Sequence, residues 1–389
     1  YKKDNDDLCI PVEVEAVEAC PRYCAVTLTG CEVKESPEWL QNKLRTIGVR
    51  PINNIVDVTN YIMMAYGQPL HCFDADMIKG SKVVVKTLPE GTKFVTLDGE
   101  EHELSDKDLA ICNAEEAMCI AGVFGGKGSG TYDSTTNVLL ESAYFHPTWV
   151  RKSARRHGLN TDASFRFERG VDPNGQLYAL KAAAMMIKDL AGGQISMDIV
   201  DVNAGTVPTH FPVEVEYNYI NKLIGKEITP DVVKEILSSL EIQIVSETET
   251  TLNLSVPAYR VDVCRPCDVV EEILRVYGYN NIELPQAMRM SVNAPQKPEP
   301  EQVRKSIADF LAANGFVETM NNSLTKSDYY AKLKTFPEEK CVRILNPLSS
   351  DLNVMRQTLL LNGLEVIAYN INRQVTNIKT FEYGSVYSF

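Results

Sequence analysis

The pattern of apolar and polar positions predicts short strands and helices in the first section of the chain, up to about Asn203. Residues 23–29 and 82–86 alternate between apolar and polar side chains, as half-buried strands do. Helices are predicted over 36–48, opened by Ser-Pro-Glu, and over 177–190, closed by two glycines. This section is therefore expected to combine a mixed sheet with helices.

A turn-rich joint at 203–212 leads into a smaller module at 212–286. The hydrophobic pattern changes period several times within it, which predicts a small α/β unit. The expected elements, in chain order, are a strand at 213–217, helices at 218–224 and 230–240, strands at 242–246 and 251–256, and a helix at 268–277.

A cluster of prolines predicts a linker after this module. They are Pro285, Pro295, Pro298 and Pro300. Beyond them, an apolar stripe predicts a helix that Asn314 and Gly315 end. The stripe consists of Val303, Ile307, Phe310 and Leu311. The chain is thus predicted to be a multidomain α+β protein with parts at 1–203, 212–286 and 300–389.

Composition narrows the class of protein. With 389 residues, 44% hydrophobic and 23% charged, the chain is globular rather than disordered. Its net charge of −13 restricts nucleic-acid binding to a local basic patch. Ten scattered cysteines suggest reduced thiols and a cytoplasmic setting, and no apolar run predicts a membrane span. A first residue other than Met, and a strand pattern interrupted at 381–389, are expected of an internal piece of a longer protein.

The densest polar segment runs from Gly48 to Tyr61, where apolar residues at 55, 56 and 58 are expected to hold a strand or a helix edge. Its candidate donors are Arg50, Asn53, Asn54, Thr59 and Asn60. Shortly after it, His71 follows a turn, and Asp74 stands three residues on, where it can orient the imidazole. Taken alone, this second segment is better explained as a structural turn with a capping histidine.

Five glycines lie within residues 122–130, yet the segment matches no nucleotide-binding pattern. Glycines let backbone N–H groups approach a ligand closely, for example as oxyanion donors, although a plain loop is an equal explanation. Glu141 closes the apolar run 138–140 and is either a cap or a recognition group.

Charged residues cluster in two further places. Residues 146–170 contain six basic residues but only two acidic ones, Asp162 and Glu168, and so form a candidate phosphate-facing patch. The alternative is a solvated helix face. The six basic residues are Arg151, Lys152, Arg155, Arg156, Arg166 and Arg169. Four carboxylates near one predicted helix start suit Mg²⁺, although their spacing alone favours a helix-capping box. They are Asp262, Asp268, Glu271 and Glu272.

Together these segments resemble the β subunit of bacterial-type phenylalanyl-tRNA synthetases over nearly the whole chain. The motifs that carry the resemblance are Arg50–Asn60, Gly67–Asp74, Ala121–Gly126, Thr161–Gly170 and Asn346–Arg356. The resemblance implies that the first section holds an editing domain, which hydrolyses Tyr wrongly attached to tRNA(Phe). It implies a nucleic-acid-binding-like fold for the module at 212–286. The part at 300–389 would begin an inactive class II synthetase-like antiparallel core.

The same resemblance implies a phenylalanine–tRNA ligase in which an α subunit makes Phe-tRNA(Phe) with ATP, within an α2β2 heterotetramer that binds tRNA(Phe). ATP is not expected to bind to this chain alone. An N-terminal tRNA-binding domain and a C-terminal anticodon-binding domain would lie outside this sequence.

Residue by residue, the resemblance places the catalytic groups of the editing pocket on His71, Thr59, Asn60 and Glu141. The substrate-binding residues fall on Arg50, Gly122, Gly125, Thr161 and Ala163. The magnesium ligands fall on the four carboxylates at 262–272, with the pattern Asp-x5-Asp-x2-Glu-Glu, and this agreement favours the metal over the capping box.

Tyr and Phe differ by one hydroxyl, so a site that hydrogen-bonds this group would accept Tyr and refuse Phe. Glu141 is the expected acceptor, and His71 with Thr59 and Asn60 would hold the water, while N–H groups of the glycine-rich loop meet the oxyanion. The sequence contains no evident nucleophilic set, so a covalent intermediate is not expected. The alternatives are a non-catalytic tRNA-binding scaffold subunit and, less favoured, a free-standing metal-dependent hydrolase.

Overall fold

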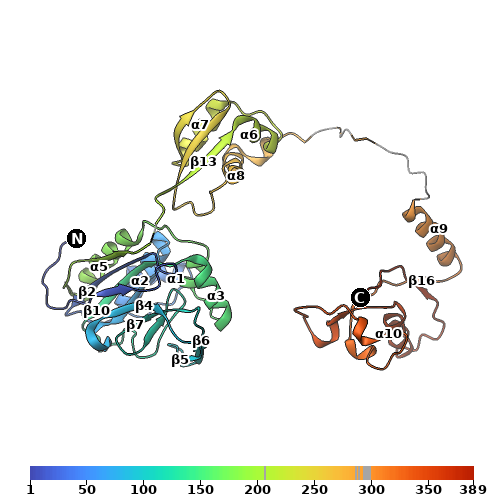
Figure 1. Ribbon diagram of the computed structural model, residues 1–389, viewed down its shortest axis with the longest axis horizontal. Helices are drawn as coiled ribbons and strands as arrows, with labels where there is room; N and C mark the ends of the chain where they lie inside the picture. The colour runs from blue at the N-terminus through green and yellow to red at the C-terminus, as the bar shows by residue number, and fades with distance from the viewer. Residues whose placement is uncertain (206, 285–286, 288–289, 292–298) are drawn as a thin grey trace. The chain divides into compact units, whose positions relative to one another are not determined.

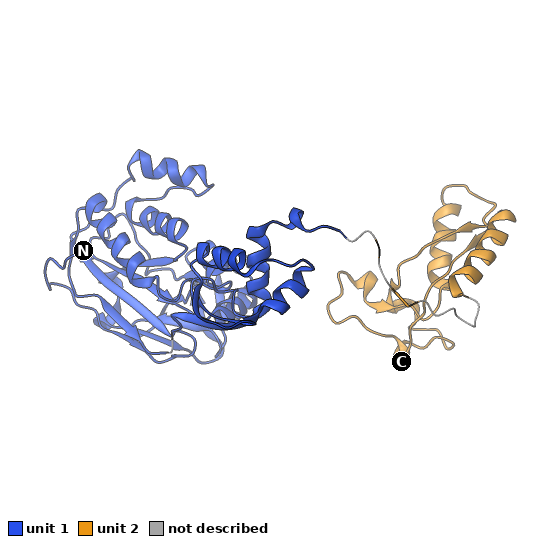
Figure 2. Cartoon of the chain, turned by 90° about the horizontal axis from the view of Figure 1, so that it is seen from above, with its two compact units in different colours: residues 1–284 blue, residues 285–389 orange. Residues whose placement is uncertain are grey.

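The computed structural model describes the chain except for residues 206, 285–286, 288–289 and 292–298. It divides into two units, residues 1–284 and 285–389 (Figure 2). Two clusters of buried apolar side chains lie in the first unit and a small one in the second. Three prolines of the predicted linker, Pro285, Pro295 and Pro298, lie outside the described residues.

An antiparallel sheet forms the centre of the first cluster (Figure 1). Its order is β11 (Gln194–Ile195), β2 (Arg22–Thr29), β10 (Val138–Tyr144) and β3 (Leu70–Asp74), and β12 (Val200–Asn203) also pairs with β2. Helices α2 (Asn54–Tyr66) and α5 (Gln176–Ala191) pack against this sheet, and α1 (Glu38–Thr46) packs on α2. The strand predicted at 23–29 and the helices predicted at 36–48 and 177–190 are confirmed.

A second, mixed sheet follows the order β1 (Val12–Val14), β4 (Val83–Thr87), β7 (Leu109–Cys112), β8 (Ala117–Ile120) and β9 (Phe124–Gly125). β1 and β4 are parallel and the remaining pairs are antiparallel. The hairpin β5 (Thr92–Val95) and β6 (Glu101–Leu104) joins it through a bridge between Thr96 and Gly126. Helix α3 (Pro147–His157) contacts β7, and α4 (Asp162–Phe167) contacts α3.

The second half of the polar segment at 48–61 begins helix α2 rather than a strand, because strong capping residues stand at both ends of this helix. The Asn53 side chain accepts hydrogen bonds from the backbone N–H groups of Ile55 (3.1 Å) and Val56 (2.9 Å). Gly67 ends the helix in the left-handed region, at φ 72°. Helix α2 then leads through a short turn into β3, which places His71.

The second cluster belongs to a small module with a three-stranded antiparallel sheet, in the order β13 (His210–Glu216), β15 (Thr251–Pro257) and β14 (Gln243–Glu247). Leu252, Leu254 and Val256 are buried at alternate positions of β15, as expected of a one-sided sheet. The helices are α6 (Tyr217–Ile224), α7 (Pro230–Ser239) and α8 (Pro266–Tyr277). Every element predicted for 213–277 is present within a few residues.

The second unit contains helices α9 (Pro300–Ala313) and α10 (Leu360–Ile371) around short strand pairs. β16 (Val317–Glu318) and β19 (Thr380–Phe381) are parallel, whereas β17 (Leu324–Thr325) and β18 (Val354–Met355) are antiparallel. The described residues of this unit thus contain one parallel and one antiparallel strand pair, and the predicted start of an antiparallel core stays a prediction. Residues 382–389, predicted to continue a strand, follow β19 without regular structure.

Short 3₁₀ helices complete the secondary structure, at Ala75–Met77, Lys79–Ser81, Tyr279–Asn281, Ser327–Tyr329, Glu338–Lys340 and Ser350–Leu352. The predicted α+β class, with several sheets, is confirmed. Among the described residues, no helix has the length and apolar character needed to cross a membrane.

Candidate active site

Two neighbouring strands place His71 and Glu141 side by side. In the antiparallel pair β3 and β10, Glu141 lies directly opposite His71, so both side chains leave the same face of the sheet. Glu141 is in the middle of β10 and not at its end, as the sequence suggested, because the strand continues to Tyr144. On its other edge Glu141 pairs with Ala25 of β2, and the residue is 4% exposed.

A small cavity of about 70 Å³ lies over this pair. Small-molecule sites typically span roughly 300–1,000 Å³, so this cavity suits part of a ligand, such as one side chain. Five of the nine predicted pocket residues line it: His71, Gly122, Gly125, Glu141 and Ala163. The prediction missed the apolar lining, formed by Pro69, Leu70, Cys119, Val123, Phe124, Phe145 and Phe167. Of these apolar residues, only Phe167 could have been inferred from the sequence, because it stands four residues after Ala163 and so shares its helix face.

Glycines keep the cavity open. A Cβ atom on Gly125 would come within 3.0 Å of the His71 Cε1 atom and 2.8 Å of the Leu97 Cδ1 atom. A Cβ atom on Gly122, which has φ 68°, would come within 3.0 Å of Phe145 and of Phe167. The glycine-rich segment is therefore more than a plain loop, since its backbone forms one wall of the cavity.

Burial controls the charge of the two polar groups. It raises the pKa of Glu141 to about 8 and lowers the pKa of His71 to about 4. The Nε2 atom of His71 is buried and has no hydrogen-bond partner among the described residues. Near neutral pH the cavity thus presents a protonated carboxyl group and a neutral imidazole.

Thr161 fastens helix α4 to the glycine-rich loop. Its hydroxyl donates to the carbonyl oxygen of Val123 at 2.9 Å and accepts from the backbone N–H of Ser164 at 3.0 Å, as an N-cap. Ala163 and Phe167 of the same helix reach the cavity. Thr161 does not line the cavity itself, but it holds two walls of the cavity together.

Three domain families match successive parts of the chain. They are the B3/4 domain over residues 19–192, the tRNA synthetase B5 domain over 213–279, and the phenylalanyl tRNA synthetase beta chain CLM domain over 284–388. A phenylalanine–tRNA ligase beta subunit from Bacteroides thetaiotaomicron is 59% identical over 100% of this chain, and one from Porphyromonas gingivalis is 47% identical over 99%. The chain belongs to the phenylalanine–tRNA ligase beta subunit family.

The chain spans 47% of the length of each of these two relatives. A solved N-terminal fragment of the phenylalanyl-tRNA synthetase beta subunit from Pyrococcus horikoshii aligns with 72% of this chain and 77% of its own length, with a TM-score of 0.33 and 18% identity. The identity to the two curated relatives confirms the resemblance to the beta subunit family. Every residue that lines the cavity lies within the B3/4 match.

In this beta-subunit chain, three predicted pocket residues besides Thr161 lie away from the lining of the cavity. Arg50 is exposed ahead of α2, and Thr59 and Asn60 belong to α2. The Thr59 hydroxyl donates to the carbonyl oxygen of Val56 within the helix, at 2.8 Å. Their predicted roles stay predictions.

The expected contact between Asp74 and His71 is not formed. Asp74 instead accepts from the Thr135 hydroxyl at 2.6 Å and caps a 3₁₀ helix through the backbone N–H of Asp76 at 3.0 Å. Both of its oxygens are thus used for structure, and the imidazole is held by its position on β3 and by an edge contact with Phe73, at 4.4 Å between ring centroids.

The four carboxylates predicted to bind magnesium do not form a ligand set in this arrangement. Asp268 accepts from the backbone N–H groups of Cys264 (3.2 Å) and Arg265 (2.8 Å), and so caps the start of α8. Glu272 pairs with Arg260 and with Arg275, each at 2.9 Å. The described part of the chain holds no group of three or more ligands close enough for one metal ion. Asp262 and Glu271 are exposed, and magnesium binding by this set stays a prediction.

Proposed function

We propose that this chain carries the editing activity of a phenylalanine–tRNA ligase beta subunit, and that its cavity hydrolyses tyrosine esters of tRNA(Phe). The observation that carries the proposal is the pairing of Glu141 with His71 inside the cavity. A buried carboxyl group is costly unless a partner satisfies it. No described residue hydrogen-bonds the Glu141 carboxyl group, so a ligand hydroxyl is the partner that it lacks.

Recognition of Tyr follows from the state of this carboxyl group. A protonated carboxyl can accept a hydrogen bond from the phenol through its carbonyl oxygen and can also donate one. Phe brings no hydroxyl and would leave the buried Glu141 unpaired. Sites built around a substrate hydroxyl reject the analogue that lacks it by roughly 10⁴–10⁵. The editing site thus selects the wrong amino acid and spares the right one.

Hydrolysis needs little more than an ordered water, because the substrate is already an activated ester. His71 is neutral, and its unpartnered Nε2 atom is placed to hold that water. With a pKa of about 4 it is a weak base, so its main contribution is position. The backbone at Gly122 and Gly125 approaches the cavity closely enough to stabilise an oxyanion. Arg50, Thr59 and Asn60 support the tRNA ester and the water from α2 and the segment before it.

The whole protein joins phenylalanine to tRNA(Phe). An α subunit provides the synthetic site and binds ATP, and the two chains form an α2β2 assembly in the cytoplasm. The names of the relatives, all phenylalanine–tRNA ligase beta subunits, support this proposal. Within it, residues 1–203 edit, 212–286 form a nucleic-acid-binding-like module, and 300–389 belong to an inactive class II synthetase-like core.

The proposal is tested by deacylation of Tyr-tRNA(Phe) and Phe-tRNA(Phe) with this chain, and with the complete α and β subunits. The expected result is faster hydrolysis of the tyrosine ester. If the complete enzyme hydrolyses neither ester, the chain is a tRNA-binding scaffold and the proposal is wrong.

A further inference from the structure

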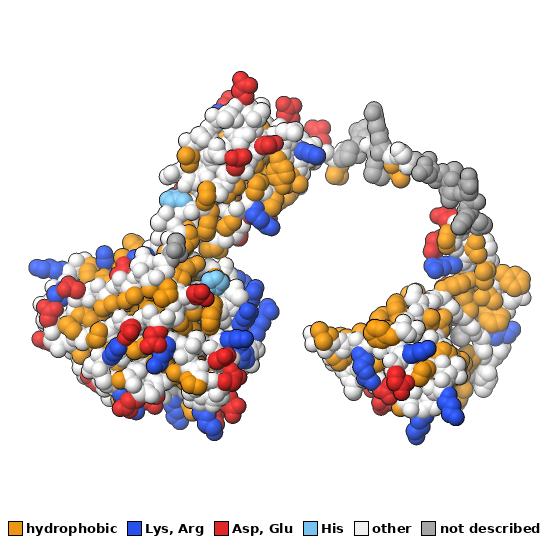
Figure 3. Space-filling view, viewed as in Figure 1, with side chains coloured by type: hydrophobic (Ala, Val, Ile, Leu, Met, Phe, Trp, Pro, Cys, Tyr) orange, Lys and Arg blue, Asp and Glu red, His pale blue; other side chains and the backbone are white. Residues whose placement is uncertain are grey.

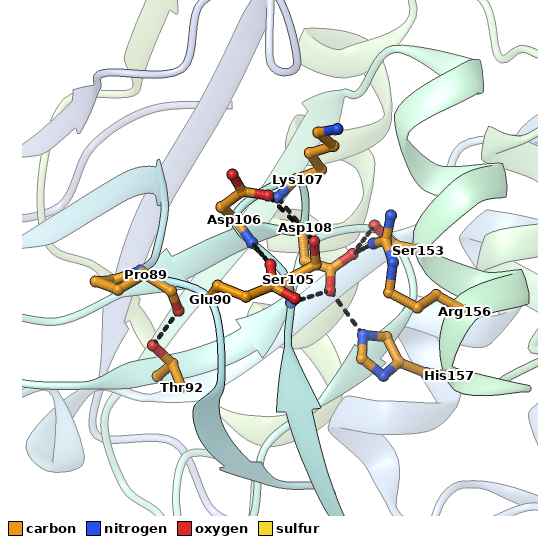
Figure 4. A network of polar contacts seen from close by, with 10 residues as sticks. All are labelled: Pro89, Glu90, Thr92, Ser105, Asp106, Lys107, Asp108, Ser153, Arg156 and His157. Carbon is orange, nitrogen blue, oxygen red and sulfur yellow. Dashed lines mark hydrogen bonds and ion pairs between the residues drawn. The ribbon is translucent and has the colours of Figure 1, made fainter.

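One buried carboxylate, that of Asp108, contacts three side chains of helix α3 (Figure 4). Asp108 accepts hydrogen bonds from the Ser153 hydroxyl at 2.6 Å and from the Ser105 backbone N–H at 2.8 Å, and it lies 2.7 Å from Nε2 of His157. Arg156 forms an ion pair with it. Burial alone would raise the pKa of Asp108, but these hydrogen bonds outweigh burial and lower it, so the group is ionised. These contacts determine which face of α3 is turned toward Asp108 and which face is turned outward.

The outer face of α3 consequently presents cations. Arg151, Lys152 and Arg155 are exposed, and none of them forms an ion pair within the described part of the chain. Figure 3 shows basic side chains gathered along this helix. The chain as a whole has a net charge of −13, so three unpaired cations on one helix face form a local attraction site for anions.

Helix α4 adds an exposed aromatic ring, Phe165, two residues from the cavity-lining Ala163 and Phe167 and thus on the other face of the helix. Phe165 is 53% exposed, and the Arg169 guanidinium lies 3.5 Å from the centre of its ring. Ala163 and Phe167 of the same helix line the cavity. Nucleic-acid bases stack on such aromatic and guanidinium planes. Since α4 contacts α3, the ring and the three cations belong to neighbouring helices.

We infer that α3 and α4 dock the acceptor end of the tRNA beside the cavity. Phe165 and Arg169 stack on a base of that end outside the cavity, and Arg151, Lys152 and Arg155 bind its phosphates. The inference rests on the proposed function, because the ester that enters the cavity is carried by RNA. An acidic protein surface could pair with the cations, but its carboxylates would not stack on the exposed Phe165 ring. A nucleic acid offers both phosphates for the cations and bases for the ring.

The phosphate contacts are tested by tRNA(Phe) binding to the full chain over a range of salt concentrations. Each phosphate contact contributes about 0.7 to 0.9 to the slope of log K against log salt. The triple variant R151A/K152A/R155A is expected to lower that slope by about 2 to 3. The control K332A/K334A/K340A changes the net charge equally at exposed positions of the other unit, and its slope is expected to match wild type.

The stacking contact is tested by substitution of the ring. Phe165→Ala is expected to raise KM for Tyr-tRNA(Phe) by about 5- to 150-fold, the usual effect of losing one stacked base, while Phe165→Tyr keeps the ring and the affinity. The ratio of kcat/KM for Tyr-tRNA(Phe) to kcat/KM for tyrosine ethyl ester should fall by the same factor, which locates the loss in nucleotide binding.

Unchanged salt slope in the triple variant together with unchanged KM in Phe165→Ala would overturn the docking surface. Weaker association with the α subunit at an unchanged tRNA slope would also overturn it, since the face would then bind protein. If wild type hydrolyses neither ester, the proposed function fails, and the salt-dependent binding still decides whether this face holds RNA.

Discussion

Glu141 and His71 lie directly opposite each other in the register of strands β10 and β3. Burial favours the uncharged form of both side chains near neutral pH. The pKa of Glu141 is raised to about 8 and that of His71 is lowered to about 4. Two desolvated groups on one face make a polar but uncharged site. Such a site matches an uncharged phenol, and this match connects the strand register to the choice between Tyr and Phe.

The two groups predict a specific dependence of stability on pH. Glu141 binds a proton in the folded state between its ordinary pKa of 4.5 and about 8, so it lowers the free energy of unfolding as pH rises through this range. His71 stays neutral when folded between about 4 and 6.5, so it raises that free energy with pH there. The two effects oppose each other up to pH 6.5, and above it Glu141 acts alone.

The free energy of unfolding of wild type, measured relative to Glu141→Gln, should therefore fall by about 2 kcal/mol between pH 6.5 and pH 8. Glutamine resembles the protonated acid and does not titrate, so the variant isolates the effect of this one group. Urea unfolding followed by circular dichroism measures the difference. A constant difference across this pH range would show that Glu141 titrates normally.

His71→Ala should slow hydrolysis of both esters and leave the preference for Tyr largely intact. The expected loss is about 2- to 13-fold, the value of one hydrogen bond that positions water. Single-turnover deacylation of both esters measures it. A loss of roughly 10²–10⁴-fold, with a pH profile that inflects well above 4, would instead identify His71 as a general base.

Gly125→Ala should block the cavity, because its Cβ atom would meet His71 and Leu97 at 3.0 Å and 2.8 Å. We expect hydrolysis of both esters to fall at least about tenfold, as expected when reacting groups are displaced. Gly363→Ala is the matched control, since its Cβ atom meets nothing within 4 Å and the residue lies in helix α10. Normal hydrolysis by Gly125→Ala would place the reaction elsewhere.

Asp268→Ala should destabilise the module at 212–286 by about 0.5–2 kcal/mol, because it removes the cap of α8. Thermal unfolding with and without millimolar Mg²⁺ separates this role from metal binding. Capping predicts the same loss in both solutions. Stabilisation of wild type by Mg²⁺ that disappears in Glu271→Gln would support the predicted magnesium site.

Local patterns predicted the secondary structure well where one face of an element is apolar. The module at 213–277 is the clearest case, because each strand and helix carries its own periodic signal. Helix α2 was ambiguous, since its β-branched residues also favour strands. Asn53 and Gly67, which cap its two ends, favour the helix over a strand. A capping residue is weaker evidence in a sequence than a periodic pattern of apolar residues.

The polar part of the site was predictable through motifs, but its assembly was not. The pairing of Glu141 with His71 joins strands 70 residues apart, and register over such a distance has no local signal. The aromatic walls come from three different segments, at Phe124, Phe145 and Phe167. The protonation of Glu141 depends on this shared burial and thus on the fold.

The central claim is that Glu141 makes the cavity selective for tyrosine. The measurement that tests it most directly is the ratio of deacylation rates for Tyr-tRNA(Phe) and Phe-tRNA(Phe), for wild type and Glu141→Ala in the complete enzyme. We predict that the variant loses about 5- to 150-fold on the tyrosine ester, equivalent to about 1–3 kcal/mol, because the buried phenol is left without a partner, and that its preference for Tyr falls by at least the same factor. An unchanged Tyr/Phe ratio in Glu141→Ala would contradict the account.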